Sequence, residues 1–316
     1  MRARISGKPL LAVAAVAGLA LLAAPWATQR MRELPVVFAA EAPADSADAP
    51  ASGAIAPTPS AAAAARTPAA PSTAPRAQSD LRREFEDTPD LYAYAQRLQP
   101  AARNGDPEAL WLISRVYDYC SPYALAPTAY ARDTRLIGEM KLRGSESMVA
   151  ARDRVSRRCA RFLPEDDLSP QAIWVVREKA AEAGSLAAEA ALLAADRPLA
   201  QGPEYRADLV DRVRRSQDAE AYAALSPAMG VAAAGEPMLA DKVAGTQFAE
   251  LAWQLAACRL GLDCGPDGAL MTNYCANGGI CSQDPQQDFP SFVYDAAIPR
   301  QGAEVVNEMV DSLVSE

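Results

Sequence analysis

Six cysteines are the residues of this chain whose type and spacing point most directly to a chemistry. They form a separated pair and a cluster of four: Cys120 and Cys159, then Cys258, Cys264, Cys275 and Cys281. An even number of cysteines beyond an export-type N-terminal segment is typical of disulfides formed in an oxidising compartment. The sequence therefore predicts three disulfides and no free thiol.

The separated pair is expected to bond with itself, because no other cysteine lies near it in the sequence. In the chain-entropy model, a bond between Cys120 and Cys159 contributes roughly 3–4 kcal/mol and fastens residues 121–158 to the domain. The cluster has the spacing Cys-x5-Cys-x10-Cys-x5-Cys, which permits three pairings. Bonds that join an expected helix at residues 247–261 to the residues after it are favoured, but spacing alone does not choose among the pairings.

A metal centre is a weaker interpretation of the same cysteines. Zinc ligands are usually Cys-x2-Cys pairs, often with histidine, and this chain has neither that spacing nor any histidine. A Cys-x2-Cys redox pair is missing for the same reason. The absence of histidine also removes Ser-His and Cys-His nucleophile pairs and imidazole bases. We therefore assign no metal ligand, no cofactor and no catalytic residue.

Carboxylates are the remaining groups that could support a reaction. Acidic residues cluster at residues 84–87, at residues 165–167 and at Asp284 with Asp288. Cleavage of a glycan needs two carboxylates at a fixed separation, or one protonated acid in an apolar cleft. A carboxylate-based peptidoglycan hydrolase or lytic enzyme of the periplasm is therefore the enzymatic alternative. The first two clusters adjoin proline and threonine, so we expect them to lie in solvated loops.

Composition bounds the class of partner. The chain has 316 residues and a net charge of −9, so it lacks the basic face that nucleic acid binding requires. Apolar residues make up 50% of the chain but aromatic residues only 6%, and alanine supplies much of the apolar share. Alanine favours helix and buries little area, which predicts a thin core between helices rather than a β-sandwich.

The N-terminal residues 1–34 indicate export. Arg2, Arg4 and Lys8 precede an apolar run at residues 9–27, as in a signal peptide or an uncleaved membrane anchor. Pro25 stands where a cleavage site needs a small residue, so the anchor is favoured. The expected location is the bacterial cell envelope, with the domain in the periplasm and anchored in the inner membrane, or secreted to the periplasm if the segment is cleaved.

A linker and one large domain follow. Residues 35–80 are rich in alanine, proline, serine and threonine, so we expect a disordered linker. Residues 81–316 are expected to form an all-helical domain with essentially no sheet, because capping residues precede prolines repeatedly and runs of alternating β-branched residues are absent. The expected helices are residues 89–103, 107–119, 128–142, 146–162, 170–183, 186–195, 204–215, 218–229, 247–261, 267–276 and 302–314.

A helix-turn-helix segment at residues 101–119 has weaker copies downstream. Gly105 suits the backbone after a helix end, Asp106 can cap the next helix, and Pro107 fits its first position. The second helix carries four residues on one face: Ala109, Ile113, Val116 and Tyr117. The alanine and the apolar residue four positions later recur as two pairs: Ala188 with Leu192, and Ala221 with Leu225. Such recurrence is typical of two-helix repeats.

These residues resemble a known family. The run Ala109-x3-Ile113-Ser114-x2-Tyr117 resembles the second-helix signature of tetratricopeptide-type repeats of the Sel-one-like subclass. Residues 179–184, with the pattern Lys-Ala-Ala-Glu-x-Gly, resemble the helix-end signature of that subclass. Ser114 stands where the family usually has glycine, and the spacing between units is irregular. The resemblance implies an α-solenoid of helical hairpins that serves as a scaffold for other proteins and has no activity of its own.

The interpretation from sequence is therefore a non-enzymatic scaffold that binds an unidentified protein of the envelope. Tyr119 and Tyr123, beside Cys120 at the expected edge of the stack, are the candidate exposed contacts for that partner. Three tryptophans are instead expected to pack in the core: Trp111, Trp174 and Trp253. A structural envelope protein without a dedicated partner is a third interpretation.

Overall fold

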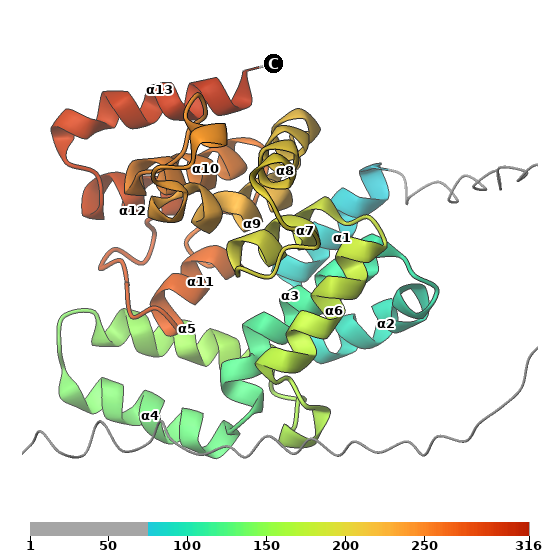
Figure 1. Ribbon diagram of the computed structural model, residues 1–316. Helices are drawn as coiled ribbons and strands as arrows, with labels where there is room; N and C mark the ends of the chain where they lie inside the picture. Colours follow the sequence, from blue (N-terminus) through green and yellow to red (C-terminus); the bar gives the residue numbers. More distant parts are fainter. Residues whose placement is uncertain (1–74, 316) are drawn as a thin grey trace, which may run out of the picture. The chain divides into compact units, whose positions relative to one another are not determined.

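The computed structural model describes residues 75–315, whose arrangement is shown in Figure 1. These residues form thirteen α-helices and four short 3-10 helices, and no strand occurs among them. The all-α prediction is confirmed for this part of the chain. The predictions for residues 1–34 and for most of the linker 35–80 lie outside the described residues.

The α-helices follow one another along the chain with short connections. Their bounds are α1 (Pro75–Asp87), α2 (Leu91–Arg103), α3 (Pro107–Ala124), α4 (Pro127–Met140), α5 (Ser145–Arg158), α6 (Pro170–Glu182), α7 (Leu186–Ala194), α8 (Pro203–Ser216), α9 (Ala219–Met229), α10 (Gln247–Arg259), α11 (Ala269–Ala276), α12 (Phe289–Ala296) and α13 (Ala303–Val314). Within residues 75–315, no helix joins the length to the apolar character that crossing a bilayer requires.

Helix starts follow the capping chemistry expected from the sequence. Asp106 accepts a hydrogen bond from the Ala109 amide at 2.8 Å, and Pro107 occupies the first turn of α3. Ser185 caps α7 in the same way. Gly105 has a φ of 81°, the left-handed conformation that lets the chain leave α2 without strain. Local chemistry therefore accounts for the turns that separate the helices.

Two helices were not expected from the sequence. The first, α1, begins at Pro75, inside the predicted linker 35–80. Its large apolar residues are only Leu81 and Phe85, so it has too short an apolar face to show a helical period. The second, α12, has eight residues and lies after a proline- and aspartate-rich stretch that resembles a loop. Both helices are placed by packing against the rest of the domain rather than by strong local signals.

Two expected helix ends are also wrong. The helix expected at residues 146–162 already ends at Arg158, so Cys159 follows α5. Instead of ending at residue 119, α3 continues through Pro122 to Ala124. Cys120 and Ala124 are completely buried, and this burial offsets the backbone hydrogen bond that a proline removes. Cys120 therefore lies inside a helix, not at its edge.

The helices pack in pairs. Contacts join α2 with α3, α4 with α5, and α6 with α7. Further contacts of α3 with α6, of α7 with α9, of α9 with α10 and of α10 with α13 link these elements into one stack. In Figure 1, α11 lies beside α5, so a late segment of the chain is placed next to a much earlier one.

The positions that match in sequence are buried alike. Ala109, Ala188 and Ala221 are each at most 1% exposed, and their small side chains let neighbouring helices approach closely. The apolar residues four positions later are buried as well: Ile113, Leu192 and Leu225. A buried alanine followed four positions later by a larger buried apolar residue therefore recurs on the core-facing sides of α3, α7 and α9.

Candidate functional site

All six cysteines are paired in the structure. Cys120 bonds to Cys159, as expected, with their Cα atoms 5.5 Å apart. The cluster of four, whose pairing the sequence left open, forms Cys258–Cys264 and Cys275–Cys281, each with a sequence separation of 6. The first of these two bonds joins α10 to the loop that follows it. Each bond lies beside residues that line a cleft between the helices.

The cleft is a cavity of about 330 Å³ bounded by α3, α6, α7, α9 and α11, and we call it the tryptophan cleft because Trp111 and Trp174 line it. Its α7 and α9 sides carry mostly small residues: Ala191, Ala194, Ala195, Ala223, Ala224 and Pro227. The polar lining residues are Glu220 of α9 and, from the other elements, Arg115, Asp118, Tyr119, Arg177, Asp263 and Asn273. The cavity thus combines a floor of small side chains with aromatic and charged walls.

Arg177 organises one wall. Its guanidinium lies 5.0 Å from the ring centre of Trp174 and 5.8 Å from that of Trp111, which is within the range of cation–π attraction. Its Nη2 donates to Asp118 at 2.8 Å. Trp174 and Arg177 are three residues apart on α6, so one helical face presents both. These contacts hold the wall in a single arrangement.

Three donors beside the cleft lack hydrogen-bond partners within residues 75–315. They are Trp111 Nε1, Tyr119 Oη and Arg177 Nε, and all three atoms are buried. The residues themselves are 4%, 1% and 9% exposed. An unpaired buried donor costs about 1–3 kcal/mol, so folded proteins retain few of them. All three belong to residues that line the cleft, so unused hydrogen-bonding capacity is concentrated at this part of the fold.

A buried ion-pair network supports the opposite wall. Arg115 pairs with Glu86 at 3.3 Å and with Glu220, and its guanidinium lies 4.3 Å from the ring centre of Phe85. Glu86 also accepts a hydrogen bond from the Ala269 amide at 2.8 Å. Through these contacts α1, α3, α9 and α11 are joined at one point.

Burial and charge shift the protonation of this network. Burial raises the pKa of Glu86, although the Arg115 charge and the Ala269 amide act in the opposite direction. Burial also tends to lower the pKa of Arg115, but the charges of Glu220 and Glu86 outweigh it and raise that pKa. Arg115 therefore stays charged, and Glu86 takes up a proton more readily than a glutamate at its ordinary pKa.

A larger cavity of about 790 Å³ adjoins the tryptophan cleft and shares Glu220, Leu262 and Asp263 with it. The first turns of α3, α7 and α9 line it. Arg82 spans this cavity, with hydrogen bonds to Glu108 at 2.7 Å and to Asp218 at 2.6 Å. Burial raises the pKa of Glu108 despite the opposing influence of Arg82. Arg82, Glu108 and Asp218 are thus already paired with one another.

The expectation that residues 84–87 form a solvated loop is wrong. They lie in α1, whose helical turn places Glu86 four residues after Arg82, on the side that faces α3 and α9. The Glu86 side chain is 8% exposed. The acidic residues further along the chain are not brought together with it. Asp288 caps α12 through the Ser291 amide, and residues 164–166 form an exposed 3-10 turn.

Tyr119 is also placed differently from the expectation. It is 1% exposed and packs edge-on against Phe85 at 6.4 Å, so the prediction of an exposed partner contact is wrong for this residue. The reason is that α3 continues past Cys120 and turns Tyr119 into the core. Tyr123 is half-buried against Tyr130, and its contact with a partner stays a prediction.

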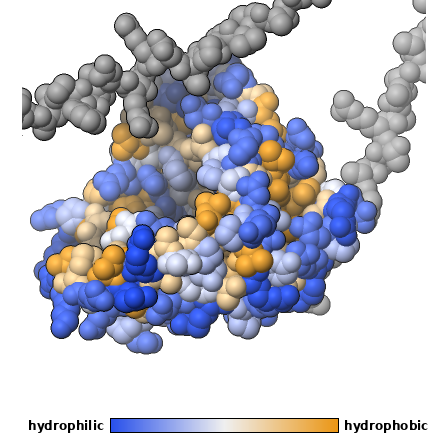
Figure 2. Space-filling view, turned by 90° about the horizontal axis from the view of Figure 1, so that it is seen from below, coloured by the Kyte–Doolittle hydropathy of each residue, from blue (hydrophilic) through white to orange (hydrophobic). Residues whose placement is uncertain are grey.

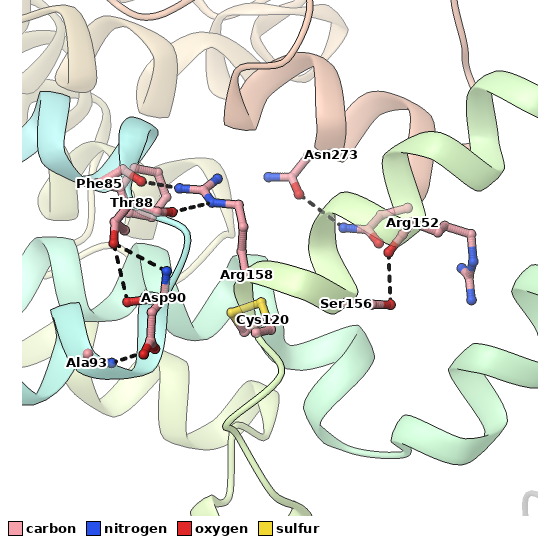
Figure 3. The surroundings of a disulfide bond; sticks show 11 residues. Phe85, Thr88, Asp90, Ala93, Cys120, Arg152, Ser156, Arg158 and Asn273 are labelled. Carbon is pink, nitrogen blue, oxygen red and sulfur yellow. Dashed lines mark hydrogen bonds between the residues drawn. A yellow bond between two sulfur atoms is a disulfide. The ribbon is translucent and has the colours of Figure 1, made fainter.

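The disulfides hold the elements that line the cleft. Cys258–Cys264 closes the loop that carries Leu262 and Asp263, and Cys275–Cys281 fixes the end of α11, which carries Asn273. Figure 3 shows the third bond, Cys120–Cys159, with the neighbouring Arg158 reaching the carbonyls of Phe85 and Thr88, the latter at 3.0 Å. The α1–α2 corner is thereby tied to the end of α5.

Other features of the described residues offer weaker sites. No group of histidine, cysteine or acidic side chains within residues 75–315 is arranged to hold a metal ion. On the face shown in Figure 2, apolar residues occur in several groups separated by hydrophilic ones. Trp111 and Trp253 are buried in the core as expected, whereas Trp174 is only partly buried. The Trp-x2-Arg spacing of α6 was the available signal for the cleft, but it does not show which helices stand opposite.

Comparison with protein-family models, curated proteins and solved structures finds no match for this chain.

Proposed function

We propose that this domain is a non-enzymatic helical-repeat scaffold that binds an extended segment of another cell-envelope protein in the tryptophan cleft. The observation that carries the proposal is the composition of the cleft, in which an alanine floor faces aromatic and charged walls. An extended peptide fits such a cleft because its main chain is narrow and presents amide and carbonyl groups at regular intervals.

The shape of the cleft supports a peptide ligand. Its alanine floor lets a main chain approach the helices closely, because no long side chain stands in the way. Trp174 is only partly buried, so its ring can pack against an apolar side chain of the ligand. Asn273 on the opposite wall carries an amide, which can both donate to and accept from a peptide group.

The proposed framework is a tetratricopeptide-type stack of the Sel-one-like subclass. Equal burial of the matched alanines supports it, and so does a second shared detail. Ser114 in α3 and Ser226 in α9 are both buried, and each hydroxyl donates to the carbonyl three residues earlier, at 2.7 and 2.9 Å. The same position in two helices therefore makes the same local contact.

The proposed location is the periplasm. The three disulfides indicate an oxidising, extracytoplasmic compartment. Basic residues followed by an apolar run at residues 1–34 support export and a tether to the inner membrane.

Site-specific photo-crosslinking tests the scaffold function. With p-benzoylphenylalanine in place of Leu270, a partly buried residue that lines the cleft, we expect one or a few defined crosslinked proteins from native envelopes. The same probe in place of Val305, an exposed residue of α13, is the control and should give none of them. The products should disappear when Arg177→Ala is added to the Leu270 probe. Equal products from both positions would contradict binding in the cleft.

A peptidoglycan hydrolase is the second candidate, and one observation favours it. Glu108 lines the larger cavity and burial raises its pKa, which is the direction that a general acid needs. Arg82, however, bonds both carboxylate oxygens of Glu108, at 2.7 and 2.9 Å, and so keeps the group occupied. Incubation of the purified protein with cell-wall sacculi decides the point. Release of muropeptides that Glu108→Gln abolishes would favour the enzyme over the scaffold.

A further inference from the structure

The charges around the tryptophan cleft point to the chemistry of its ligand. Resting on the proposed function, we propose that the bound segment is basic: a lysine or arginine side chain of the ligand lies at Asp118 and Asp263, beside an apolar side chain that packs on Trp174. The inference concerns the sequence of the ligand, whereas the proposed function concerns only its extended form.

The two arginines of the cleft are already engaged. Arg115 is held between Glu86 and Glu220, whose side chains are 8% and 6% exposed. The Arg177 side chain is 10% exposed, lies against two tryptophan rings and bonds Asp118. An acidic ligand would therefore find no exposed guanidinium in the cleft.

Two carboxylates of the cleft remain open to a ligand. The Asp118 side chain is 57% exposed although one of its oxygens accepts from Arg177. Asp263 is exposed, accepts a hydrogen bond from the Gly265 amide at 2.8 Å, and forms no ion pair within residues 75–315. A carboxylate oxygen accepts more than one hydrogen bond, so both side chains can bind an ammonium or guanidinium group.

The surroundings reinforce this preference. The adjoining larger cavity adds three carboxylates, those of Glu86, Glu108 and Asp218, against two guanidinium groups, those of Arg82 and Arg83. The chain as a whole carries a net charge of −9. A field of this sign attracts a cationic segment and repels an anionic one before contact.

The contacts divide the ligand into three parts. Its cationic side chain meets Asp118 and Asp263, and its neighbouring main chain lies on the alanine floor. Its apolar side chain covers Trp174. The combination selects a basic residue adjacent to an apolar one in an extended chain, and the disulfide Cys258–Cys264 keeps Asp263 in place for it.

Peptide titration of the oxidised, full-length protein tests the inference. The probes are three fluorescent peptides built from the repeated triplets Leu-Lys-Ala, Leu-Gln-Ala and Leu-Glu-Ala. We expect the lysine peptide to bind at least about tenfold more tightly than the glutamine peptide, and the glutamate peptide to bind most weakly. The lysine preference should diminish at high salt, because the carboxylates are exposed.

Matched variants locate the effect. Asp118→Asn with Asp263→Asn keeps the side-chain oxygens that accept from Arg177 and Gly265, so the fold should persist by circular dichroism. In this variant the lysine preference should fall to within about twofold, with the glutamine peptide unaffected. Asp153→Asn with Asp241→Asn changes the net charge equally at exposed positions outside the cleft and should retain the preference.

The outcomes separate the two proposals. If the glutamine peptide binds as tightly as the lysine peptide, or if the control variant loses the preference as fully as the cleft variant, the basic ligand is refuted while the peptide-binding cleft stands. If none of the three peptides binds, or if Trp174→Ala leaves the binding of all three unchanged, peptide binding in the cleft is refuted as well.

Discussion

Arg115 is a cation enclosed by protein, and the groups around it determine what it contributes to the stability of the fold. Two carboxylates, Glu86 and Glu220, neutralise it, and the Phe85 ring covers its guanidinium. The ion pairs of such a group matter mainly because a buried charge without its partner is strongly unfavourable. The network thereby makes the position of α1 depend on residues of α3 and α9.

Replacement of Arg115 measures this dependence. Arg115→Met should lower the free energy of unfolding by about 3–5 kcal/mol, because Glu86 and Glu220 are left buried without a cation. Arg83→Met is the control, because its side chain is 67% exposed and its pair with Asp80 should contribute at most about 1 kcal/mol. Urea unfolding of both variants checks the difference, and equal losses would show that the network adds nothing to stability.

The protonation of Glu86 should appear as a pH dependence of stability. Because burial raises its pKa, the folded chain binds this proton at a higher pH than the unfolded chain does. The free energy of unfolding should therefore rise as the pH falls from neutral towards the ordinary value of 4.5, and level off below it. Glu86→Gln should flatten this slope in thermal unfolding measured across that range.

Three other carboxyl groups set the limits of that measurement, and one of them is Glu250, whose pKa is also raised by burial. Glu108 also has a raised pKa, so part of the slope should remain in Glu86→Gln. Asp90 acts with the opposite sign, because hydrogen bonding from the Ala93 amide lowers its pKa, but its effect belongs to pH values below the window. Glu304→Gln, at an exposed position, is the control and should leave the slope as it is. An unchanged slope in Glu86→Gln would contradict the assignment.

At the scale of elements, the disulfides divide between stability and site geometry. The Cys120–Cys159 bond closes a sequence separation of 39, whereas Cys258–Cys264 and Cys275–Cys281 close separations of 6. The loss of chain entropy grows with loop length, so the long closure should stabilise the fold most. The short closures instead fix the loop and helix that line one wall of the cleft.

Removal of each kind of bond should have a different consequence. Cys120→Ser with Cys159→Ser should cost about 4 kcal/mol of stability and leave the affinity for the lysine peptide largely unchanged. Cys258→Ser with Cys264→Ser should cost about 2 kcal/mol of stability. This variant should weaken the binding of the lysine peptide more than that of the glutamine peptide, because the loop that carries Asp263 is released. Chemical unfolding and peptide titration of both variants give the comparison. Equal losses of affinity would refute the division of roles.

At the scale of the whole molecule, the negative net charge and the three disulfides suit an oxidising compartment outside the cytoplasm. Its negative charge disfavours nucleic acid as a partner and accords with a cationic one. Its three disulfides involve every cysteine of the chain. The two short bonds hold the loop and the helix at one wall of the cleft, and Cys120–Cys159 fastens the end of α3 at another.

Thiol titration checks the oxidation state of the complete protein. The chain purified from its native compartment, denatured without reductant, should show no reactive thiol. Reduction before denaturation should yield six reactive thiols and lower the midpoint temperature of thermal unfolding. Detection of four or more thiols in the unreduced protein would exclude the three disulfides and the extracytoplasmic location that they indicate.

The sequence by itself determined the helical class, the positions of most helices and the absence of imidazole chemistry. Capping, proline placement and apolar period act over a few residues, as at Asp106 and Pro107, so they are visible without a structure. Only the tertiary structure decided the pairing of Cys258 with Cys264, the burial of Glu86 and the assembly of the cleft. Those features depend on contacts between residues far apart in the chain, such as Glu86 with the Ala269 amide, and no local pattern specifies such contacts.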